Sequence, residues 1–391
     1  MEYGCHHHAA DSVQDELFRY EGAEKTLEVH FGGSGKTLRA LPRSVWDEIL
    51  DHACSRILSK TSGVSLDAYV LSESSLFVYD WRLYLKTCGK TTLLKCLPPL
   101  LEAVEKHLGA SADWLRFSHK NFAFPEDQRF PHTSFEQETK FCLDWCASTS
   151  LTSAHVLGDL LSDHWNVLYV DLRSSNISFR SSTPLSIASV STDSIITRPA
   201  TARSDMSMDA FVVSDDIGIH ENIVNVMMYG MERGVADHFY PRPTEKPDVA
   251  AMRATLESGI QSLFAEEKDA VFDPYMFSPC GYSLNALIRG EFYATIHVTP
   301  EENFSYASFE TNLPTSLYDE LLQRVLNVFK PQRGTIALFS DSKHQECLSL
   351  KNNDGRKAMY ERMSHGSARI HDVFFAEMSS FSRLPSTYSC E

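Results

Sequence analysis

The chain has 391 residues, of which 43% are hydrophobic and 11% aromatic, so it can bury a full core and is not a disordered or fibrous protein. Its 36 Lys and Arg stand against 52 Asp and Glu, a formal net charge of -16. This balance argues against a general binder of nucleic acids or acidic membranes, because phosphate contacts need clustered cations.

The cysteines and the lack of targeting signals predict a cytoplasmic protein. Nine cysteines are scattered without a CxxC pair, which favours reduced thiols over a disulfide scaffold. The first residues have no basic segment followed by an apolar one, and no later window reaches about 18 apolar residues. We therefore expect neither secretion nor a membrane span.

The first half of the chain alternates predicted strands and helices after an expected flexible tail at 1–17. The His-rich run in that tail is expected to be solvated and not a metal site. In chain order the patterns predict a strand at 25–31, a helix at 43–60, a hairpin of two runs at 68–80 and 81–88, a helix at 91–108 interrupted by Pro98 and Pro99, and strands at 112–118 and 164–171.

The second half repeats this style. A hairpin is predicted from runs at 277–290 and 291–301, followed by a strand at 305–312, an amphipathic helix at 317–330 and a strand at 334–340. Each half thus has strand pairs followed by a helix. This order favours an α+β duplication with helices packed outside antiparallel sheets.

Two segments depart from this order. Residues 173–210 are crowded with Ser, Thr and Arg and have no sustained period, which is typical of a flexible surface insertion; a phosphorylated regulatory loop is the alternative. Residues 343–391 are polar and irregular. We expect them to form a C-terminal extension that is partly disordered.

Familiar nucleotide and hydrolase motifs are absent. GGSGKT at 32–37 is similar to a P-loop, but His30 stands where the motif needs its first Gly, and Pro42 interrupts the helix that should follow. The glycines are better explained by a turn between a strand and a helix. The sequence also has no HExxH, GxSxG or GxGxxG.

Four segments place reactive polar residues inside apolar β runs. They are 71–78, 86–89, 279–283 and 297–301. Read alone, the SESS cluster of the first is also typical of a bulge or a strand end, and the Cys of the second is typical of a core position. Together they hold Ser, Cys, His and Glu, the residue types that serve as nucleophile, base and proton donor.

The order and content of six motifs resemble eukaryotic S-adenosylmethionine decarboxylase. The motifs are LSESSLFV at 71–78, LKTCG at 85–89, HKNF at 119–122, PCGYS at 279–283, IHVTPE at 296–301 and FSYASFETN at 304–312. The resemblance implies a decarboxylase domain over 18–342. It also implies a four-layer αββα sandwich of two antiparallel sheets with helices outside.

Carried over from the family, the resemblance implies a proenzyme that cleaves itself between Glu73 and Ser74. Ser74 would become a pyruvoyl group that binds the substrate amine as a Schiff base. The other catalytic positions are Cys88 as proton donor, Ser283 and His297 in processing, and the acidic residues Glu21 and Glu24. A strained backbone at the cleavage site would help the reaction.

The resemblance implies S-adenosylmethionine as the substrate. Tyr20 and Phe277 match the aromatic pair that stacks on adenine, and Glu301 matches the carboxylate that binds the ribose hydroxyls. The Glu73 backbone would lie close to the adenine. Decarboxylation would yield the aminopropyl donor for spermidine and spermine synthesis.

The family's buried diamine site is only partly matched. Its positions correspond to a set of charged and polar residues: Glu28, Lys86, Ser118, Glu221 and Glu310. Asn225 stands where relatives stimulated by putrescine carry a second acidic residue. The loss of one carboxylate argues against activation by putrescine, because an uncompensated buried dication is unfavourable.

Two alternatives stay open at this stage. A catalytically dead paralogue that acts as a regulatory subunit should lack the processing serine or its helpers, and the sequence has them all. A pyruvoyl decarboxylase for another amino acid would not need the aromatic pair. The resemblance is compatible with a monomer, a homodimer or a heterodimer with a paralogue.

Overall fold

Two antiparallel sheets form the centre of the structure, a computed structural model that describes residues 21–32, 35–146, 151–173, 222–302, 304–314, 318–341, 359–370 and 374–385. Within those ranges each sheet has eight strands. Sheet A contains, in spatial order, β2 (Ile57–Ser62), β3 (Leu66–Leu71), β4 (Ser74–Tyr79), β5 (Arg82–Thr87), β1 (Lys25–Phe31), β6 (Ala112–Lys120), β8 (His164–Asp171) and β7 (Leu151–Gly158). Sheet B contains β10 (Val271–Met276), β11 (Tyr282–Ile288), β12 (Phe292–Thr299), β13 (Tyr306–Thr311), β9 (Ile223–Tyr229), β14 (Arg333–Asp341), β16 (Phe374–Arg383) and β15 (Tyr360–Ile370).

The two sheets have the same strand order. In both, the first strand of the half lies between its fifth and sixth strands, and the seventh is at the edge beyond the eighth. β4 of the first half therefore corresponds to β12 of the second. This confirms the predicted duplication.

The sheets face each other and bury side chains between them. Phe77 of β4 stacks on Tyr293 of β12 with ring centroids 3.9 Å apart, and both belong to a core that has members from each sheet. Leu27 and Val29 of β1 belong to a different core, which they form together with residues of the helices on the outer face of sheet A. They share this face because residues two apart in a strand point to the same side.

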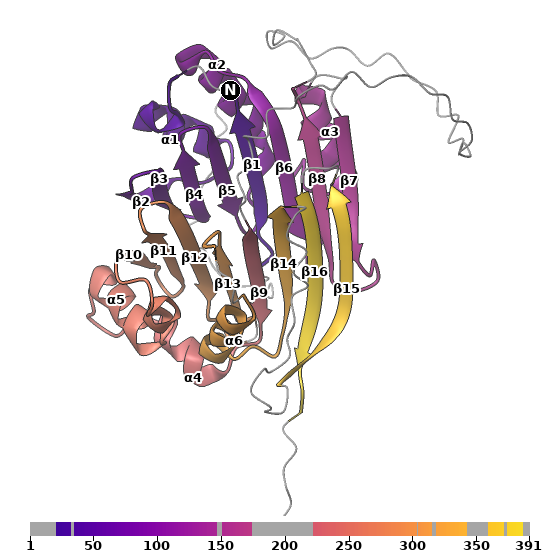
Figure 1. The fold of residues 1–391 in the computed structure, drawn as a ribbon. Coiled ribbons are helices and arrows are strands. Elements are labelled where there is room, and N and C mark those ends of the chain that lie inside the picture. The colour runs from indigo at the N-terminus through magenta and orange to yellow at the C-terminus, as the bar shows by residue number, and fades with distance from the viewer. Residues whose placement is uncertain are drawn as a thin grey trace, which may run out of the picture. The chain divides into compact units, whose positions relative to one another are not determined.

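Helices cover the outer face of each sheet (Figure 1). Those on sheet A are α1 (Arg43–Asp51), α2 (Leu97–Leu108) and α3 (Phe135–Trp145), and those on sheet B are α4 (Arg233–Ala236), α5 (Pro247–Glu257) and α6 (Tyr318–Phe329). Their apolar stripes supply residues such as Trp46 and Leu322, each almost fully buried. Burial of one such side chain contributes about 1.5–3 kcal/mol. The four-layer αββα sandwich is confirmed.

The helix expected at 43–60 is wrong in its second half. α1 ends at Asp51, and Ile57–Ser62 is the edge strand β2. Between them Cys54 has a φ of 57°, a left-handed conformation that a helix cannot continue through. The apolar residues after this turn keep helical spacing by chance.

Two other local expectations also need correction. Pro98 and Pro99 do not interrupt a helix but stand in the first turn of α2, where their missing N–H groups have no intrahelical partner to lose. The run at 68–80 is not one strand, since a turn at Ser72 and Glu73 divides it into β3 and β4. The polar SESS cluster is this turn and the start of β4.

The expectation of an irregular C-terminal segment is wrong for two stretches. Tyr360–Ile370 and Phe374–Arg383 form β15 and β16, and β16 pairs with β14 inside sheet B. β15 is an edge strand whose side chains are largely exposed, so its composition is polar and gives little strand signal. The tail at 1–17 and nearly all of the insertion at 173–210 lie outside the described residues.

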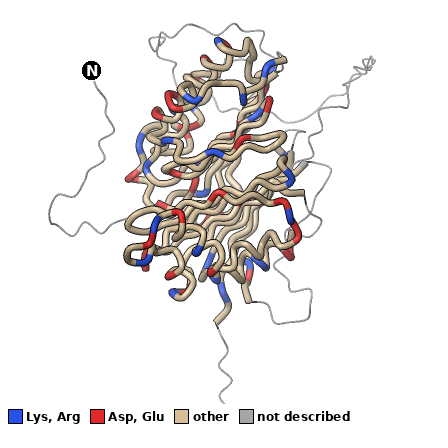
Figure 2. The backbone as a smooth tube through the Cα atoms, turned by 90° about the vertical axis from the view of Figure 1, so that its left-hand side faces the viewer, with Lys and Arg blue, Asp and Glu red and all other residues tan. Residues whose placement is uncertain are grey.

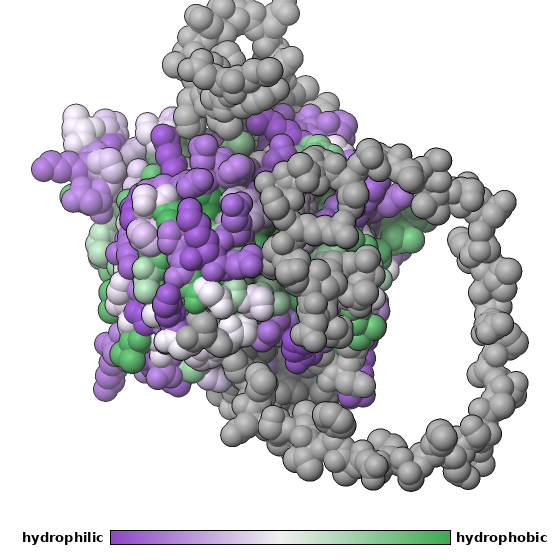
Figure 3. Space-filling view, turned by 90° about the horizontal axis from the view of Figure 1, so that it is seen from above, coloured by the Kyte–Doolittle hydropathy of each residue, from purple (hydrophilic) through white to green (hydrophobic). Residues whose placement is uncertain are grey.

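The charged residues of the described part lie mostly in loops and helices, while most strand positions carry other residues (Figure 2). Seen from above, its surface is mainly hydrophilic with scattered apolar side chains (Figure 3).

No helix among the described residues is long and apolar enough to cross a membrane. Six cysteines of this part are free thiols: Cys54, Cys88, Cys96, Cys142, Cys146 and Cys280.

Candidate active site

The turn between β3 and β4 places Ser74 in a strained conformation. Ser74 is the first residue of β4, is almost fully buried and has a φ of 125°. A residue with a Cβ rarely adopts such a backbone conformation, which costs about 1–3 kcal/mol. The strain expected at the Glu73–Ser74 bond is therefore present.

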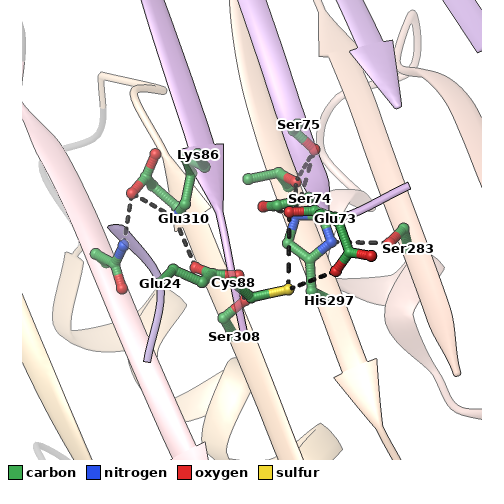
Figure 4. Close-up of polar contacts among 12 residues, drawn as sticks. Glu24, Glu73, Ser74, Ser75, Lys86, Cys88, Ser283, His297, Ser308 and Glu310 are labelled. Carbon is green, nitrogen blue, oxygen red and sulfur yellow. Dashed lines mark hydrogen bonds and ion pairs between the residues drawn. The ribbon is translucent and has the colours of Figure 1, made fainter. Parts of the chain in front are cut away.

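His297 of β12 faces this turn from the opposite sheet (Figure 4). Its Nε2 atom is 3.0 Å from Ser74 Oγ, and its Nδ1 atom is 2.8 Å from Ser283 Oγ. Burial lowers the pKa of His297 to about 4, so the imidazole is neutral at neutral pH. A neutral ring held beside a serine hydroxyl can accept a proton.

Strand register explains why several polar side chains surround His297. Ser283 pairs with His297, and Asn285 pairs with Thr295, so all four share one face of β11 and β12. Ser75 Oγ donates to Asn285 Oδ1 at 2.8 Å. Thr295 Oγ1 is 2.9 Å from His297 Nε2.

Cys88 follows β5 and contacts both the backbone and the side chain of Glu73. The Cys88 N–H donates to the Glu73 carbonyl oxygen at 3.1 Å, and Cys88 Sγ lies 3.7 Å from that oxygen and 3.9 Å from Glu73 Oε2. Burial raises the pKa of Glu73 to about 7. Ser74, His297 and Cys88 thus meet at the Glu73–Ser74 bond.

A buried ion network lies beside these residues (Figure 4). Lys86 Nζ is 2.9 Å from Glu24 Oε2 and 2.7 Å from Glu310 Oε2. Ser308 donates to Glu24, and Asn225 donates to Glu310. Although burial opposes ionisation, the Lys86 ammonium holds the pKa of Glu24 below its usual range, and the two carboxylates raise the pKa of Lys86.

A second buried pair lies on β1 and β6. Arg116 Nη2 is 2.6 Å from Glu28 Oε2, and His30 Nε2 is 2.7 Å from Glu28 Oε1. Against the effect of burial, the Arg116 guanidinium lowers the pKa of Glu28 to about 2. Arg116, Ser118 and Glu310 line a small cavity between the sheets, so most positions of the expected diamine network are close together.

Glu21 is tied to backbone near Cys88. Its carboxylate accepts from the N–H groups of Ala23 at 3.1 Å and Phe124 at 2.9 Å, and its carbonyl oxygen accepts from Gly89 N–H. Burial raises the pKa of Glu21. The neighbouring candidate Tyr20 lies outside the described residues, as does Glu221.

Phe277 and Glu301 lie at one end of the hairpin that carries Ser283 and His297. Phe277 precedes β11 and Glu301 follows β12, and the antiparallel register brings these ends together. Glu301 Oε2 is buried and has no hydrogen-bond partner among the described residues.

Among all the described residues, no group of three or more His, Cys, Asp or Glu could hold a metal ion.

Three polar residues of the site are not part of the sequence motifs: Asn285, Thr295 and Arg116. One signal was available for the first two, because polar residues two apart in the apolar strands β11 and β12 must share a face. Arg116 carries a similar signal, as a cation within the apolar run of β6. Strand patterns alone could not show that these faces meet.

The sequence comparisons agree with this geometry. The profile of the adenosylmethionine decarboxylase family matches residues 18–382. An S-adenosylmethionine decarboxylase proenzyme from Dictyostelium discoideum is 36% identical over 335 residues, which cover 82% of this chain and 75% of that protein. The proenzyme of the same name from Xenopus laevis is 32% identical over 372 residues, 93% of this chain and 96% of that one.

The chain therefore belongs to the adenosylmethionine decarboxylase family, as its motifs indicated. Among solved structures, the crystal structure of a Trypanosoma brucei AdoMetDC-delta26 monomer is similar with a TM-score of 0.52 and 23% sequence identity. The match covers 79% of this chain and 99% of that one. It agrees with the fold described above.

Proposed function

We propose that this chain is a proenzyme that cleaves itself between Glu73 and Ser74 and then decarboxylates S-adenosylmethionine, yielding the aminopropyl donor for spermidine and spermine synthesis. The observation that carries the proposal is the buried, strained Ser74, with His297 at its hydroxyl and Cys88 at the adjoining carbonyl. Membership of the adenosylmethionine decarboxylase family supports the same reaction.

The first step of cleavage is an acyl shift. Ser74 Oγ attacks the carbonyl carbon of Glu73 and loses its proton, while the peptide C–N bond breaks and the amine of Ser74 takes up a proton. An ester thus replaces the amide. The Cys88 N–H, 3.1 Å from the Glu73 oxygen, stabilises the negative charge that develops there. Release of the strain at Ser74 lowers the barrier further.

The second step is an elimination. His297, neutral at pH 7 and beside Ser74 Oγ, accepts the Ser74 Cα proton while the Cβ–Oγ bond breaks. Glu73 leaves as a carboxylate with the electron pair of that bond. Ser283 orients the imidazole through Nδ1. Water then converts the remaining dehydroalanine, through its imine, to a pyruvoyl group with loss of ammonia.

The residues present fit a pyruvoyl group at position 74, since it would be made from the side chain they surround. When bound to substrate, this group supplies an electron sink for the carbanion that remains when CO2 leaves. Cys88 returns one proton to the substrate α-carbon. Phe277 would stack on the adenine, and the unpartnered oxygen of Glu301 suits a ribose hydroxyl.

We also propose that the enzyme does not need a diamine. The described carboxylates between the sheets already have cations: Lys86 lies between Glu24 and Glu310, and Arg116 pairs with Glu28. These three carboxylates face two cations, which leaves one negative charge and too little to compensate a dication. The Arg116 guanidinium therefore supplies, beside Glu28, the positive charge that a bound diamine would otherwise supply.

A catalytically dead regulatory paralogue is the alternative function. It would have no reason to keep a strained Ser74 together with its base and its polarised carbonyl, because strain persists only where the surrounding structure maintains it. No described feature favours this alternative.

The intact mass of the purified protein under denaturing conditions tests the proposal. We expect two fragments, one ending at Glu73 and one that begins with pyruvate in place of Ser74, together with release of CO2 from carboxyl-labelled S-adenosylmethionine. Ser74→Ala, the matched control, should remain a single chain of about the full 44.1 kDa. A single uncleaved mass for the wild type, with no CO2 release, would overturn the proposal.

A further inference from the structure

Lys25 is a fully buried lysine that the reaction steps above do not use. It lies on the face of β1 that points toward the helices, together with Leu27 and Val29. Its exposed fraction is 0%. Its Nζ donates to the Gly89 carbonyl oxygen at 2.8 Å and to Gln128 Oε1 at 3.2 Å. The first of these contacts reaches the residue that directly follows Cys88.

The ammonium of Lys25 has no carboxylate partner among the described residues. Both of its hydrogen-bond acceptors are neutral, and the Phe122 ring, 5.2 Å away, adds only a cation–π contact. Burial lowers the pKa of Lys25 to about 8. The ionisable groups that oppose this shift are, largest first, Cys88, Glu138, Glu21 and Glu73.

Glu138 already has two histidine partners. Its carboxylate is 2.8 Å from His119 Nε2 and 2.7 Å from His132 Nδ1. His119 Nδ1 also faces the Lys120 carbonyl oxygen at 2.7 Å. His132 Nε2 instead accepts from a backbone N–H, so that ring is neutral.

The other two carboxyl groups form no ion pair with Lys25 among the described residues. Glu21 accepts two backbone N–H bonds, and burial raises its pKa. Glu73, with a pKa raised by burial to about 7, is 3.9 Å from Cys88 Sγ. Of the groups around Lys25, the Cys88 thiol has the largest effect on it, and the effect between two charges is mutual.

We propose that Lys25 is a positioning residue that stabilises the thiolate of Cys88 during decarboxylation. The inference rests on the proposed function. When the bond to CO2 breaks, its electron pair stays on the substrate α-carbon, and the Cys88 proton completes the new C–H bond. The thiolate left behind is adjacent in sequence to Gly89, whose carbonyl oxygen holds the Lys25 ammonium at 2.8 Å, and it regains a proton from solvent. Through Gly89, Lys25 also fixes the segment that carries the thiol.

Alkylation of Cys88 at different pH values tests the inference. Processed wild type and Lys25→Met are treated with iodoacetamide between pH 5 and 9, and the Cys88 peptide is followed by mass spectrometry. We expect the pH midpoint of alkylation to rise by about 1–2 units in Lys25→Met, the effect of removing a close opposite charge. The kcat for decarboxylation should fall with little change in KM.

The matched control is Lys90→Met. Lys90 is two residues from Cys88, but its side chain is half exposed and pairs with Asp127 at 3.2 Å, so solvent screens its charge. We expect this variant to keep the wild-type midpoint and kcat. Lys25→Arg keeps the charge and should move the midpoint back toward wild type.

Lys25→Gln keeps a donor toward Gly89 and removes the charge, and it replaces Lys25→Met if that variant does not fold. A wild-type alkylation midpoint in Lys25→Gln would overturn the inference. Alkylation needs no substrate, so this outcome is separate from a failure of the proposed function, which would appear as a wild type that neither cleaves nor releases CO2.

Discussion

Burial sets the proton affinity of the groups at the proposed cleavage site. It lowers the pKa of His297 to about 4 and raises the pKa of Glu73 to about 7. His297 is therefore a base over the whole neutral range, while Glu73 changes charge within it. His297 contacts the Ser74 hydroxyl and the Glu73 carboxyl contacts Cys88, so processing and decarboxylation should respond differently to pH.

The first prediction concerns the pH dependence of cleavage. Because the base form of His297 is lost only as the pH falls through about 4, we expect the contribution of this base to stay constant between pH 6 and 8. The cleavage rate should then fall about tenfold for each pH unit below 4. Freshly translated proenzyme, transferred to buffers across this range and followed by gel electrophoresis, gives the rates. A drop of about threefold between pH 7 and 6 would instead indicate a base with an ordinary histidine pKa near 6.5.

The second prediction concerns the orientation of His297. Ser283→Ala removes the hydroxyl 2.8 Å from Nδ1, so the ring loses a contact that fixes its direction. We expect self-cleavage to slow by about 10–100-fold, as judged by the remaining full-length chain over time. Ser340→Ala is the control, since Ser340 is also buried but belongs to β14. Equal rates in wild type and Ser283→Ala would contradict the role of Ser283.

At the scale of elements, the site is shared by equivalent strands of the two halves. Ser74 lies on β4, and His297 lies on the corresponding strand β12. Cleavage at Ser74 would leave β1, β2 and β3 in the short chain. β1 pairs with β5 and β6, and β3 pairs with β4, so the short chain is part of sheet A.

The third prediction is that the two chains stay together after cleavage. Separation would break the backbone pairing of β1 with two neighbours and expose the apolar face that packs against the helices. We expect the fragments to elute together from size exclusion in native buffer and to separate only in denaturant. Elution of free short chain in native buffer would show that sheet A opens after the cut.

Strand alternation and helical spacing predicted most of the helices and strands. These patterns gave wrong predictions where a turn or the pairing with a neighbouring strand, and not the side-chain pattern, determines the structure. The apolar residues at 57 and 58 fit a helix as well as a strand, and only the left-handed turn at Cys54 decides between them. β15 is a polar edge strand, which is held in place by pairing with β16 and not by its own composition. The family motifs named the candidate site residues, but Arg116 and Lys25 become relevant only once the sheets are assembled.

At the scale of the whole molecule, we expect the charge buried between the sheets to determine the response to diamines. The fourth prediction is that millimolar putrescine changes kcat/KM for S-adenosylmethionine by less than about twofold, because Arg116 already compensates Glu28 at 2.6 Å. Arg116→Leu removes the guanidinium and leaves that carboxylate with His30 alone, and we expect its reduced activity to rise with added putrescine. A strong stimulation of the wild type would show that a dication site exists beside Arg116.

The same buried charges determine how acid unfolds the protein. Glu28 and Glu138 have a pKa of about 2 in the folded state, against an ordinary value of 4.5. A carboxyl group of this kind contributes stability above its unfolded pKa and loses it as the pH falls through the folded one. Each of the two contributes at most about 3 kcal/mol.

At milder pH the titrations oppose each other. His132 and His297, with pKa lowered by burial from 6.5 to about 4, bind protons first in the unfolded state, so the folded state loses stability between pH 6.5 and 4. Glu73, with a pKa raised from 4.5 to about 7, binds its proton first in the folded state. Its contribution therefore has the opposite sign between pH 7 and 4.5.

The fifth prediction follows from these signs. For Ser74→Ala, which stays one chain, we expect the free energy of unfolding to change little between pH 7 and 5 and to fall steeply below pH 4.5, where Glu28 and Glu138 take up protons only on unfolding. Urea denaturation at pH 7, 5.5, 4.5 and 3.5 measures it. A steep loss already between pH 7 and 5.5 would mean that the two buried histidines outweigh Glu73. A flat profile down to pH 3.5 would contradict the strongly lowered pKa of the two carboxylates.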